Sequence, residues 1–345
     1  MNIKQIEKKL TEGGIEPNEA KIEAKMLVKH FLGGVNIYLS DDFECSEDLL
    51  AAVTLRSVKR IPIQYIIGTA YFMDEDFIVN ENVLIPRDET EILVRKAVEI
   101  INGGIEEWKD RGRGERKQET WKGKREKEIG NWELVIEPFD RSTLRPFDRS
   151  TQSQSLNHFF KSPPNIQPPK HPLRVLDIGT GSGCIACIIA KLTDSQVLGV
   201  DISTDALRVA LENSSKLGLF NKAVFRKSDI FSNINPEEKF DVIISNPPYI
   251  PQKERGNLQT EVGFEPESAL FARDVDGIEF YEKIVTKATG FLNEGGYLMF
   301  ELGINQSDKV KILMQNAGFE NIEIEKDLAG IERVITGNRK QETGK

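Results

Sequence analysis

The chain is poor in cysteine and has no long apolar run. Three cysteines among 345 residues are too few for a disulfide framework, which favours a reducing compartment. No apolar stretch reaches the roughly 18–20 residues needed to span a bilayer. The first residues form an amphipathic pattern instead of the apolar core of a secretory signal. We therefore expect a cytoplasmic protein that does not bind membranes.

An excess of basic residues is also missing. The formal net charge is −9 at pH 7, whereas nonspecific nucleic-acid binders draw most of their affinity from Lys and Arg side chains that neutralise phosphates. An acidic average is compatible with a local basic patch. The charge nevertheless argues against DNA or RNA as a direct partner.

Residues 1 to about 70 contain three segments with the apolar spacing of amphipathic helices. Asn18 is placed to cap the second segment. The apolar positions are Ile3, Ile6 and Leu10; Ile22, Met26, Leu27 and Phe31; and Leu49, Leu50, Val53 and Leu55. We interpret this region as a helical domain that recognises the substrate or covers the site. A purely structural cap is the alternative.

A short extended connector around residues 71–79 leads to another helix. This helix opens within residues 84–91 and ends near Gly103. Asp88 and Glu91 have the spacing of a capping box, and acidic residues in a first turn are favoured by the helix dipole. Capping accounts for both acids, so neither is assigned a catalytic role. It does not account for Arg87.

Residues of about 104–171 interrupt the pattern. Mixed charges are dense in the first part of this segment, and prolines crowd its end. The hexapeptide Pro-Phe-Asp-Arg-Ser-Thr occurs at 138–143 and again at 146–151. Such a composition predicts a mostly disordered insertion. It falls inside a second domain that spans residues 71–345.

From residue 173 onward, strand patterns and helix patterns alternate. We expect strands at 174–178, 196–201, 223–227, 240–245, 296–302, 322–325 and 333–336. Helices are expected from 183, at 203–218, at 277–292 and at 307–317. The alternation predicts an α/β fold with a doubly wound, mostly parallel sheet of seven strands. In such a sheet, ligands bind beyond the carboxyl ends of the strands.

A glycine loop follows the first of these strands. Its residues are Gly179, Thr180, Gly181, Ser182 and Gly183, with the spacing G-x-G-x-G and not the G-x-G-x-x-G of dinucleotide sites. Asp177 precedes the loop, where a carboxylate is a poor neighbour for a pyrophosphate and a good one for an ammonium group. Asp201, at the end of the next strand, can accept both hydroxyls of a ribose. Together these residues predict a site for S-adenosyl-L-methionine.

Cys184 and Cys187 form a lone C-x-x-C at the start of the helix after this loop. Zinc sites built on this motif have a second pair of ligands, which the sequence does not supply. We interpret the two residues as small buried side chains and expect no metal.

Asp229 and Ile230 follow the third strand. In a doubly wound sheet this position borders the adenine of an adenosine cofactor. Asp229 would meet the exocyclic amine and Ile230 would pack on the ring. A polar turn without a ligand is the alternative for each residue.

The most informative segment is a tetrapeptide that follows the fourth strand. It consists of Asn246, Pro247, Pro248 and Tyr249. The prolines lack an N–H and fix the backbone, so the segment is a stiff loop that cannot continue a sheet. The Asn246 side-chain oxygen and the Pro247 carbonyl can receive two N–H donors of a planar amide or amine, and the Tyr249 ring can cover its flat face. The alternative is a proline-rich turn without chemistry.

Residues 173–337 resemble class I S-adenosylmethionine-dependent methyltransferases, and the tetrapeptide narrows the resemblance to enzymes that methylate planar nitrogen. Within these, the chain resembles the protein-(glutamine-N5) methyltransferases of peptide chain release factors, the PrmC/HemK family. Further matching segments are 62–68, 84–91, 265–270, 277–281 and 327–330. The resemblance covers the chain except for the insertion. Asp88 stands where the family usually has Pro, and Ile230 where an aromatic residue is common.

The resemblance implies transfer of a methyl group to the glutamine of the GGQ loop of a release factor, which is the expected protein partner. It assigns Asn246, Pro247 and Tyr249 to catalysis, with Asn246 also beside the cofactor. Pro248 and Arg87 would help to bind the substrate.

Three alternatives stay open. A sister family methylates a glutamine of a ribosomal protein and resembles the chain in the core, although residues 87–91 fit the release-factor branch better. The tetrapeptide also suits the exocyclic amine of adenine in nucleic acids, against which the acidic charge and the small helical region argue. From another class of function, the chain could bind the cofactor without catalysis.

Overall fold

The computed structural model describes residues 1–33, 42–103 and 172–340. The predicted insertion at 104–171 and its hexapeptide repeat lie outside the described residues. Within the described ranges, no helix is both long enough and apolar enough to cross a membrane.

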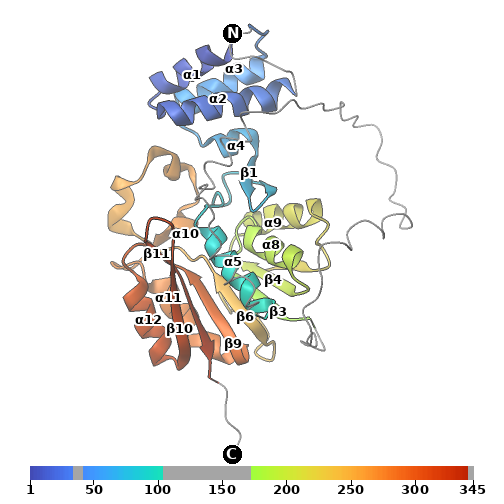
Figure 1. Cartoon of the computed structure of the whole chain (residues 1–345), viewed down its shortest axis with the longest axis vertical. Coiled ribbons are helices and arrows are strands. Elements are labelled where there is room, and N and C mark those ends of the chain that lie inside the picture. Colours follow the sequence, from blue (N-terminus) through green and yellow to red (C-terminus); the bar gives the residue numbers. More distant parts are fainter. Residues whose placement is uncertain (34–41, 104–171, 341–345) are drawn as a thin grey trace, which may run out of the picture. The chain divides into compact units, whose positions relative to one another are not determined.

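Four helices occupy the described part of residues 1–70 (Figure 1). Their bounds are α1 (Ile3–Glu12), α2 (Pro17–Leu32), α3 (Glu47–Ser57) and α4 (Ile63–Ile67). The first helix begins with a capping box, in which the side chains of Asn2 and Gln5 each accept the other's backbone N–H. Ser46 caps the third helix by a single bond, in which its hydroxyl accepts the backbone N–H of Leu49. The fully buried Leu10, Leu27 and Leu49 form part of the core of this region.

Two expectations about α2 are wrong. The N-cap is Glu16 and not Asn18, because Pro17 occupies the first helical position and the Glu16 carboxylate accepts the backbone N–H of Asn18. The predicted apolar face is also wrong at one position, Ile22, whereas Leu27 is buried and Met26 and Phe31 pack against the core. Ile22 is 42% exposed, and Ala24 and Leu27 face the core together with the charged Glu23.

A hairpin and a helix join this region to the sheet. The hairpin consists of β1 (Thr69–Phe72) and β2 (Glu75–Ile78), and the helix is α5 (Thr90–Ile101). The predicted capping box at α5 is wrong, because the helix begins at Thr90 and its N-cap, Glu89, makes no side-chain capping bond. The Glu91 carboxylate instead accepts Met73 N at 3.2 Å and Arg95 Nη2 at 3.0 Å.

Within residues 172–340, seven strands form one sheet in the order β10-β11-β9-β6-β3-β4-β5. In chain order they are β3 (Arg174–Ile178), β4 (Gln196–Asp201), β5 (Ala223–Lys227), β6 (Phe240–Ser245), β9 (Leu292–Glu301), β10 (Phe319–Lys326) and β11 (Glu332–Arg339). β11 is antiparallel to both neighbours, and the other adjacent pairs are parallel. The predicted doubly wound sheet and its mostly parallel strands are confirmed.

Helices cover both faces of this sheet. They are α8 (Cys184–Leu192), α9 (Thr204–Lys216), α11 (Glu279–Phe291) and α12 (Ser307–Asn316). α5 and α8 pack on one face, in a cluster with Val175 and Ile244. α11 and α12 pack on the other, in a cluster with Leu176 and Ile243. Burial on both faces explains why the central strands are continuous apolar runs.

The order of the strands reverses at β3. From β3 the chain continues outward through β4 and β5, then returns to the other side of β3 as β6 and continues to β9. The loops after β3 and β6 therefore leave adjacent strands and diverge to opposite faces. Ligands of doubly wound sheets bind at such a point.

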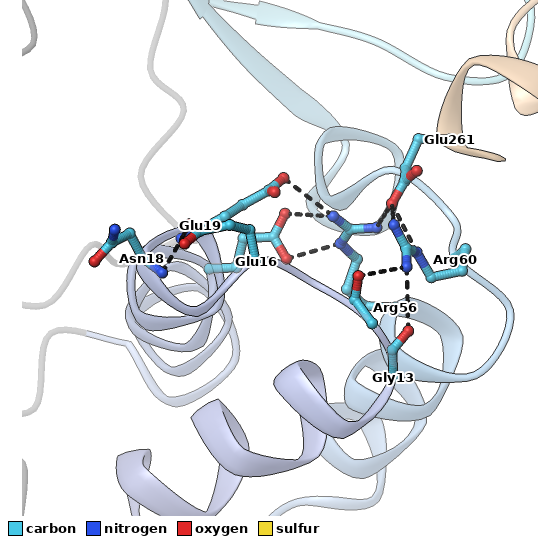
Figure 2. A network of polar contacts seen from close by, with 9 residues as sticks. Gly13, Glu16, Asn18, Glu19, Arg56, Arg60 and Glu261 are labelled. Atoms are coloured by element: carbon cyan, nitrogen blue, oxygen red, sulfur yellow. Dashed lines mark hydrogen bonds and ion pairs between the residues drawn. The ribbon is translucent and has the colours of Figure 1, made fainter. Parts of the chain in front are cut away.

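A segment of short elements follows the proline tetrapeptide and was not predicted. It contains β7 (Ile250–Pro251), η1 (Gln252–Asn257), η2 (Thr260–Phe264), α10 (Glu267–Leu270) and β8 (Phe271–Ala272). Glu261 in this segment bonds to arginines of the helical region (Figure 2). Arg56 and Arg60 each place a guanidinium nitrogen 2.7 Å from its Oε1. The Arg56 side chain is only 2% exposed and also donates to Glu23 at 2.7 Å.

Candidate active site

A cavity lies beyond the carboxyl ends of the central strands. It contains about 790 Å³ of space, including open solvent. Eight of the predicted site residues line it: Gly179, Gly181, Asp201, Asp229, Ile230, Asn246, Pro247 and Pro248. Six others do not line it: Asp177, Thr180, Ser182, Gly183, Tyr249 and Arg87.

The glycine loop turns tightly because three of its residues have positive φ. The φ values of Gly179, Gly181 and Gly183 are +71°, +53° and +78°, in the region that favours glycine. The backbone N–H groups of Gly179 and Thr180 both donate to Val200 O, at 2.8 and 3.0 Å, which ties the loop to the end of β4.

Two of these glycines serve different purposes. A Cβ added to Gly179 would meet no atom within 4 Å, so the absence of a side chain leaves space in the cavity. A Cβ added to Gly183 would lie 2.9 Å from the Ala210 Cβ. Gly183 is therefore needed for close packing of the loop against α9. Gly179 leaves room for a ligand to approach the backbone.

Asp177, near the end of β3, is fully buried. Thr180 Oγ1 donates to its Oδ2 at 2.6 Å, and within the described part of the chain its Oδ1 has no hydrogen-bond partner. Burial raises the pKa of this carboxyl to about 7, and the nearby Asp201 charge adds to the increase. A buried carboxylate oxygen without a partner next to the glycine loop suits a cationic ligand group.

Asp201 is the last residue of β4 and lines the cavity. Its Oδ2 accepts Gly181 N at 3.0 Å and its Oδ1 accepts Ser203 N at 2.8 Å. Burial raises its pKa above the ordinary value. Each carboxylate oxygen can accept two hydrogen bonds, so both oxygens retain capacity for the hydroxyls of a ligand.

Asp229 and Ile230 lie in a turn after β5 that is held by serine hydroxyls. Ser228 Oγ donates to Ile230 O at 2.9 Å, and Ser232 Oγ accepts Asp229 N at 3.0 Å. Ile230 has a positive φ of +53°, which is rare for a β-branched residue. Its side chain packs against the core while also lining the cavity. Asp229 is exposed.

Asn246 and Tyr249 are connected through two buried residues, Thr90 and Glu301. Asn246 Nδ2 donates to Thr90 Oγ1 at 3.2 Å, and Thr90 Oγ1 donates to Glu301 Oε2 at 2.5 Å. Tyr249 Oη donates to the other carboxylate oxygen, Glu301 Oε1, at 3.4 Å. One carboxylate thus holds both ends of the tetrapeptide.

Thr90 and Glu301 were not among the predicted site residues. Burial raises the pKa of Glu301 to about 7, and the Glu89 charge adds to the increase. The hydrogen bonds from Thr90 and Tyr249 and the Arg333 charge lower this pKa and offset part of the increase. A signal was present in the sequence, because Glu301 directly follows the apolar run 297–300 at the buried end of β9. Thr90 lies in the matching segment 84–91, but nothing in that segment indicated its partner, since the pairing depends on the packing of α5 against the sheet.

Gln306 is a third polar residue that was not predicted. Its Nε2 donates to Tyr249 O at 2.9 Å and to Asp276 O at 3.0 Å. Gly303 N donates to its Oε1 at 3.1 Å. Gln306 therefore fixes the backbone after the tetrapeptide against the loop that follows β9.

Arg87 pairs with Glu265, whose side chain is 2% exposed. The same carboxylate accepts Ile85 N at 3.0 Å. These bonds hold Glu265 in place. The next residue, Pro266, lines the cavity. In the structure, Arg87 thus supports the wall of the cavity from outside.

Cys184 and Cys187 are free thiols buried in α8, which confirms their interpretation as buried residues. Burial raises the pKa of the Cys184 thiol to about 12 and raises that of Cys187 as well. Both side chains therefore remain protonated and weakly nucleophilic at neutral pH.

Comparison with known proteins identifies relatives over nearly the whole chain. A family model described as "Methyltransferase domain" matches residues 169–338. The chain is 32% identical to a protein named "Release factor glutamine methyltransferase" from Geobacter sulfurreducens, covering 95% of this chain and 92% of the relative. A protein of the same name from Rhodopirellula baltica is 33% identical over 92% of this chain and 88% of its own. A "Bifunctional methyltransferase" from Rickettsia typhi is 32% identical over 97% of this chain, which spans 57% of that protein.

Proposed function

The chain belongs to the PrmC/HemK-type family of class I S-adenosylmethionine-dependent methyltransferases, and from this premise we propose that it methylates the side-chain amide nitrogen of a glutamine in a peptide chain release factor. The observation that carries the proposal is the placement of Asn246. Its side chain lines the cavity with Nδ2 bonded to Thr90. Its Oδ1 accepts no hydrogen bond from the residues that the structure describes, and it is an acceptor suited to an amide N–H.

The cavity fits S-adenosylmethionine, which when bound supplies a methyl group on a positively charged sulfur. The Asp177 Oδ1, which has no partner within the described chain, would accept the ammonium group. The open space at Gly179 admits the ligand to the loop backbone. Asp201 would hold the ribose hydroxyls, and Asp229 and Ile230 would border the adenine.

A glutamine amide nitrogen is a weak nucleophile because its lone pair is delocalised into the carbonyl. The Asn246 Oδ1 and the Pro247 carbonyl would accept its two N–H groups and direct the nitrogen toward the methyl group. Both acceptors also favour positive charge that develops on the nitrogen. This is catalysis by positioning and electrostatic stabilisation. Tyr249 would hold the plane of the amide.

The partner we propose is the release factor itself. Residues 1–70 would form a separate recognition domain that grips the factor while its glutamine enters the cavity. Arg87, through Glu265, would keep the adjoining wall in place. The acidic net charge of −9 disfavours direct binding to nucleic acid.

We predict that Asn246→Ala abolishes methyl transfer and leaves cofactor affinity nearly unchanged, because the variant loses an acceptor for the substrate amide. The measurement is incorporation of label from S-adenosylmethionine into a release factor, with cofactor binding followed by calorimetry. Asn316→Ala, at the exposed end of α12, is the matched control. Wild-type turnover in Asn246→Ala, or label on a ribosomal protein or DNA instead, would refute the proposed function.

A further inference from the structure

We propose that Thr90 and Glu301 are positioning residues that decide which atom of the Asn246 amide faces the substrate. The inference rests on the proposed function, because it assumes that Asn246 receives an N–H of the substrate. It goes further by explaining why the oxygen, and not the nitrogen, of Asn246 is presented to the cavity.

A threonine hydroxyl has a single hydrogen to donate. Thr90 Oγ1 lies 2.5 Å from Glu301 Oε2, a short separation that is typical of a hydroxyl bonded to a carboxylate. An ionised carboxylate has no hydrogen to give, so the hydroxyl hydrogen is committed to Glu301. Thr90 can then only accept a hydrogen bond from Asn246.

The orientation of Asn246 follows from this commitment. Its amide offers one atom that donates and one that accepts, and only the donor, Nδ2, can bond to Thr90, which it does at 3.2 Å. The acceptor, Oδ1, is thereby turned away from Thr90 and left for the substrate. A flipped amide would set two acceptors against each other and present N–H groups to the N–H groups of the substrate.

Burial keeps water from substituting for these partners. Thr90 is 3% exposed and Glu301 is 2% exposed. A buried polar group that loses its hydrogen-bond partner does not readily find another. The direction of the hydrogen bonds is therefore set by the ionisation of Glu301.

Several polar and charged groups face the Glu301 carboxyl group. They are the hydroxyls of Thr90 and Tyr249, the Glu89 carboxylate at the start of α5, and the Arg333 guanidinium on β11. The Tyr281 hydroxyl donates to the backbone carbonyl of Glu301 at 2.9 Å. When Glu301 takes up a proton it becomes a donor, Thr90 is free to donate to Asn246, and the amide loses its fixed direction.

Thr90→Val tests the inference because it removes the hydroxyl and nearly preserves the shape. We expect kcat to fall by about tenfold or more, with no change in the affinity for S-adenosylmethionine. Thr90→Ser restores the hydroxyl and should recover most of the rate. Thr193→Val is the matched control, since Thr193 is also buried and donates its hydroxyl, to Ile189 O. Wild-type kcat in Thr90→Val would overturn the inference.

A second measurement holds even if Thr90→Val folds poorly. In the wild type, kcat at saturating cofactor should fall as the pH drops through about 7, where Glu301 gains its proton. Saturating cofactor removes the contribution of Asp177 to this pH dependence, because the ammonium group of the bound cofactor would lower the pKa of the Asp177 carboxyl group. Glu301→Gln should be slower than the wild type and should lack this acidic limb. An unchanged limb in Glu301→Gln would contradict the inference.

The two proposals fail separately. If the wild type transfers no methyl group to a release factor, the proposed function is wrong. If the wild type transfers it and Thr90→Val does so equally fast, only the role of Thr90 and Glu301 is refuted.

Discussion

Two buried carboxyl groups, Asp177 and Glu301, lie at the carboxyl ends of the sheet and behave differently from ordinary surface acids. Burial raises the pKa of each to about 7, so both ionise close to neutral pH. A buried charge without full pairing destabilises a fold. Residues that disfavour stability in this way are typical of binding and catalytic sites.

Replacing Asp177 by Asn should stabilise the cofactor-free protein at alkaline pH. The folded-state pKa is raised from 3.8 to about 7, so the folded state holds the proton more tightly than the unfolded state. The stabilisation present at low pH is therefore lost as the pH rises through about 7. In thermal unfolding, the stability of Asp177→Asn relative to the wild type should increase from mildly acidic to alkaline pH. Calorimetry should show that the variant binds the cofactor more weakly. A gain on acidification instead would contradict this assignment.

Gly179→Ala and Gly183→Ala form a matched pair, because both place a Cβ at positive φ. That conformation alone costs about 1–2 kcal/mol. Gly183→Ala adds a contact 2.9 Å from Ala210 Cβ and should unfold at lower denaturant concentration than Gly179→Ala. Gly179→Ala should be the more stable of the two variants and should lose more cofactor affinity than Gly183→Ala. Equal stability and equal affinity in the two variants would refute the distinction.

Site residues that lie at or directly after a strand could be predicted from the sequence. The glycine loop and the tetrapeptide each follow a strand, and Asp201 ends one. Their placement at the ends of parallel strands could be inferred from the alternation alone. Thr90 could not be inferred, because it lies 156 residues from Asn246 and meets it only after α5 has packed on the sheet.

At the scale of elements, two carboxylates of the segment from β7 to β8 bond to arginines outside it. Glu261 bonds to Arg56 and Arg60, and Glu265 bonds to Arg87. The elements in this segment are two to six residues long. They carry no apolar period from which they could have been predicted. Ion pairs therefore compensate for the small apolar contact that such short elements can make.

Removing the Arg56 charge should destabilise the protein strongly. Glu23 is 4% exposed, and its pKa is raised by burial in spite of the Arg56 charge. Arg56→Met would leave this carboxylate buried without its partner, which typically costs about 3–5 kcal/mol. Arg56→Met combined with Glu23→Gln should recover part of that loss in chemical denaturation.

Arg208→Met provides the control for Arg56, because Arg208 is 72% exposed and pairs with the exposed Asp205. Surface pairs of this kind contribute little, so its denaturation midpoint should match that of the wild type. If Arg56→Met also matched the wild type, the network in Figure 2 would have no part in stability.

The helices and strands were predicted unequally, for physical reasons. Strands β3, β4 and β6 are buried on both faces and form largely apolar runs, and they have the predicted bounds. The edge strand β5 is only partly buried and also has the predicted bounds. Ile22 of α2 was misplaced because the small Ala24 and the paired Glu23 face the core while Ile22 faces solvent. Residue hydrophobicity alone does not reveal a buried ion pair.

At the scale of the whole molecule, the strand order assembles the site. The reversal at β3 brings the loops after β3, β4, β5 and β6 around one cavity. Glu301 at the end of β9 and Thr90 at the start of α5 complete the polar contacts of the tetrapeptide. The fold class could be predicted from the alternation, whereas the contacts between distant segments required the structure.

The most direct test of the central claim is the chemical position of the transferred methyl group. A release factor incubated with the protein and S-adenosylmethionine can be digested and sequenced by tandem mass spectrometry. We predict one methyl group on the side-chain amide nitrogen of a single glutamine, the one in the GGQ loop. A methyl group on another residue type, or an unmodified release factor beside a methylated ribosomal protein or nucleic acid, would contradict the account.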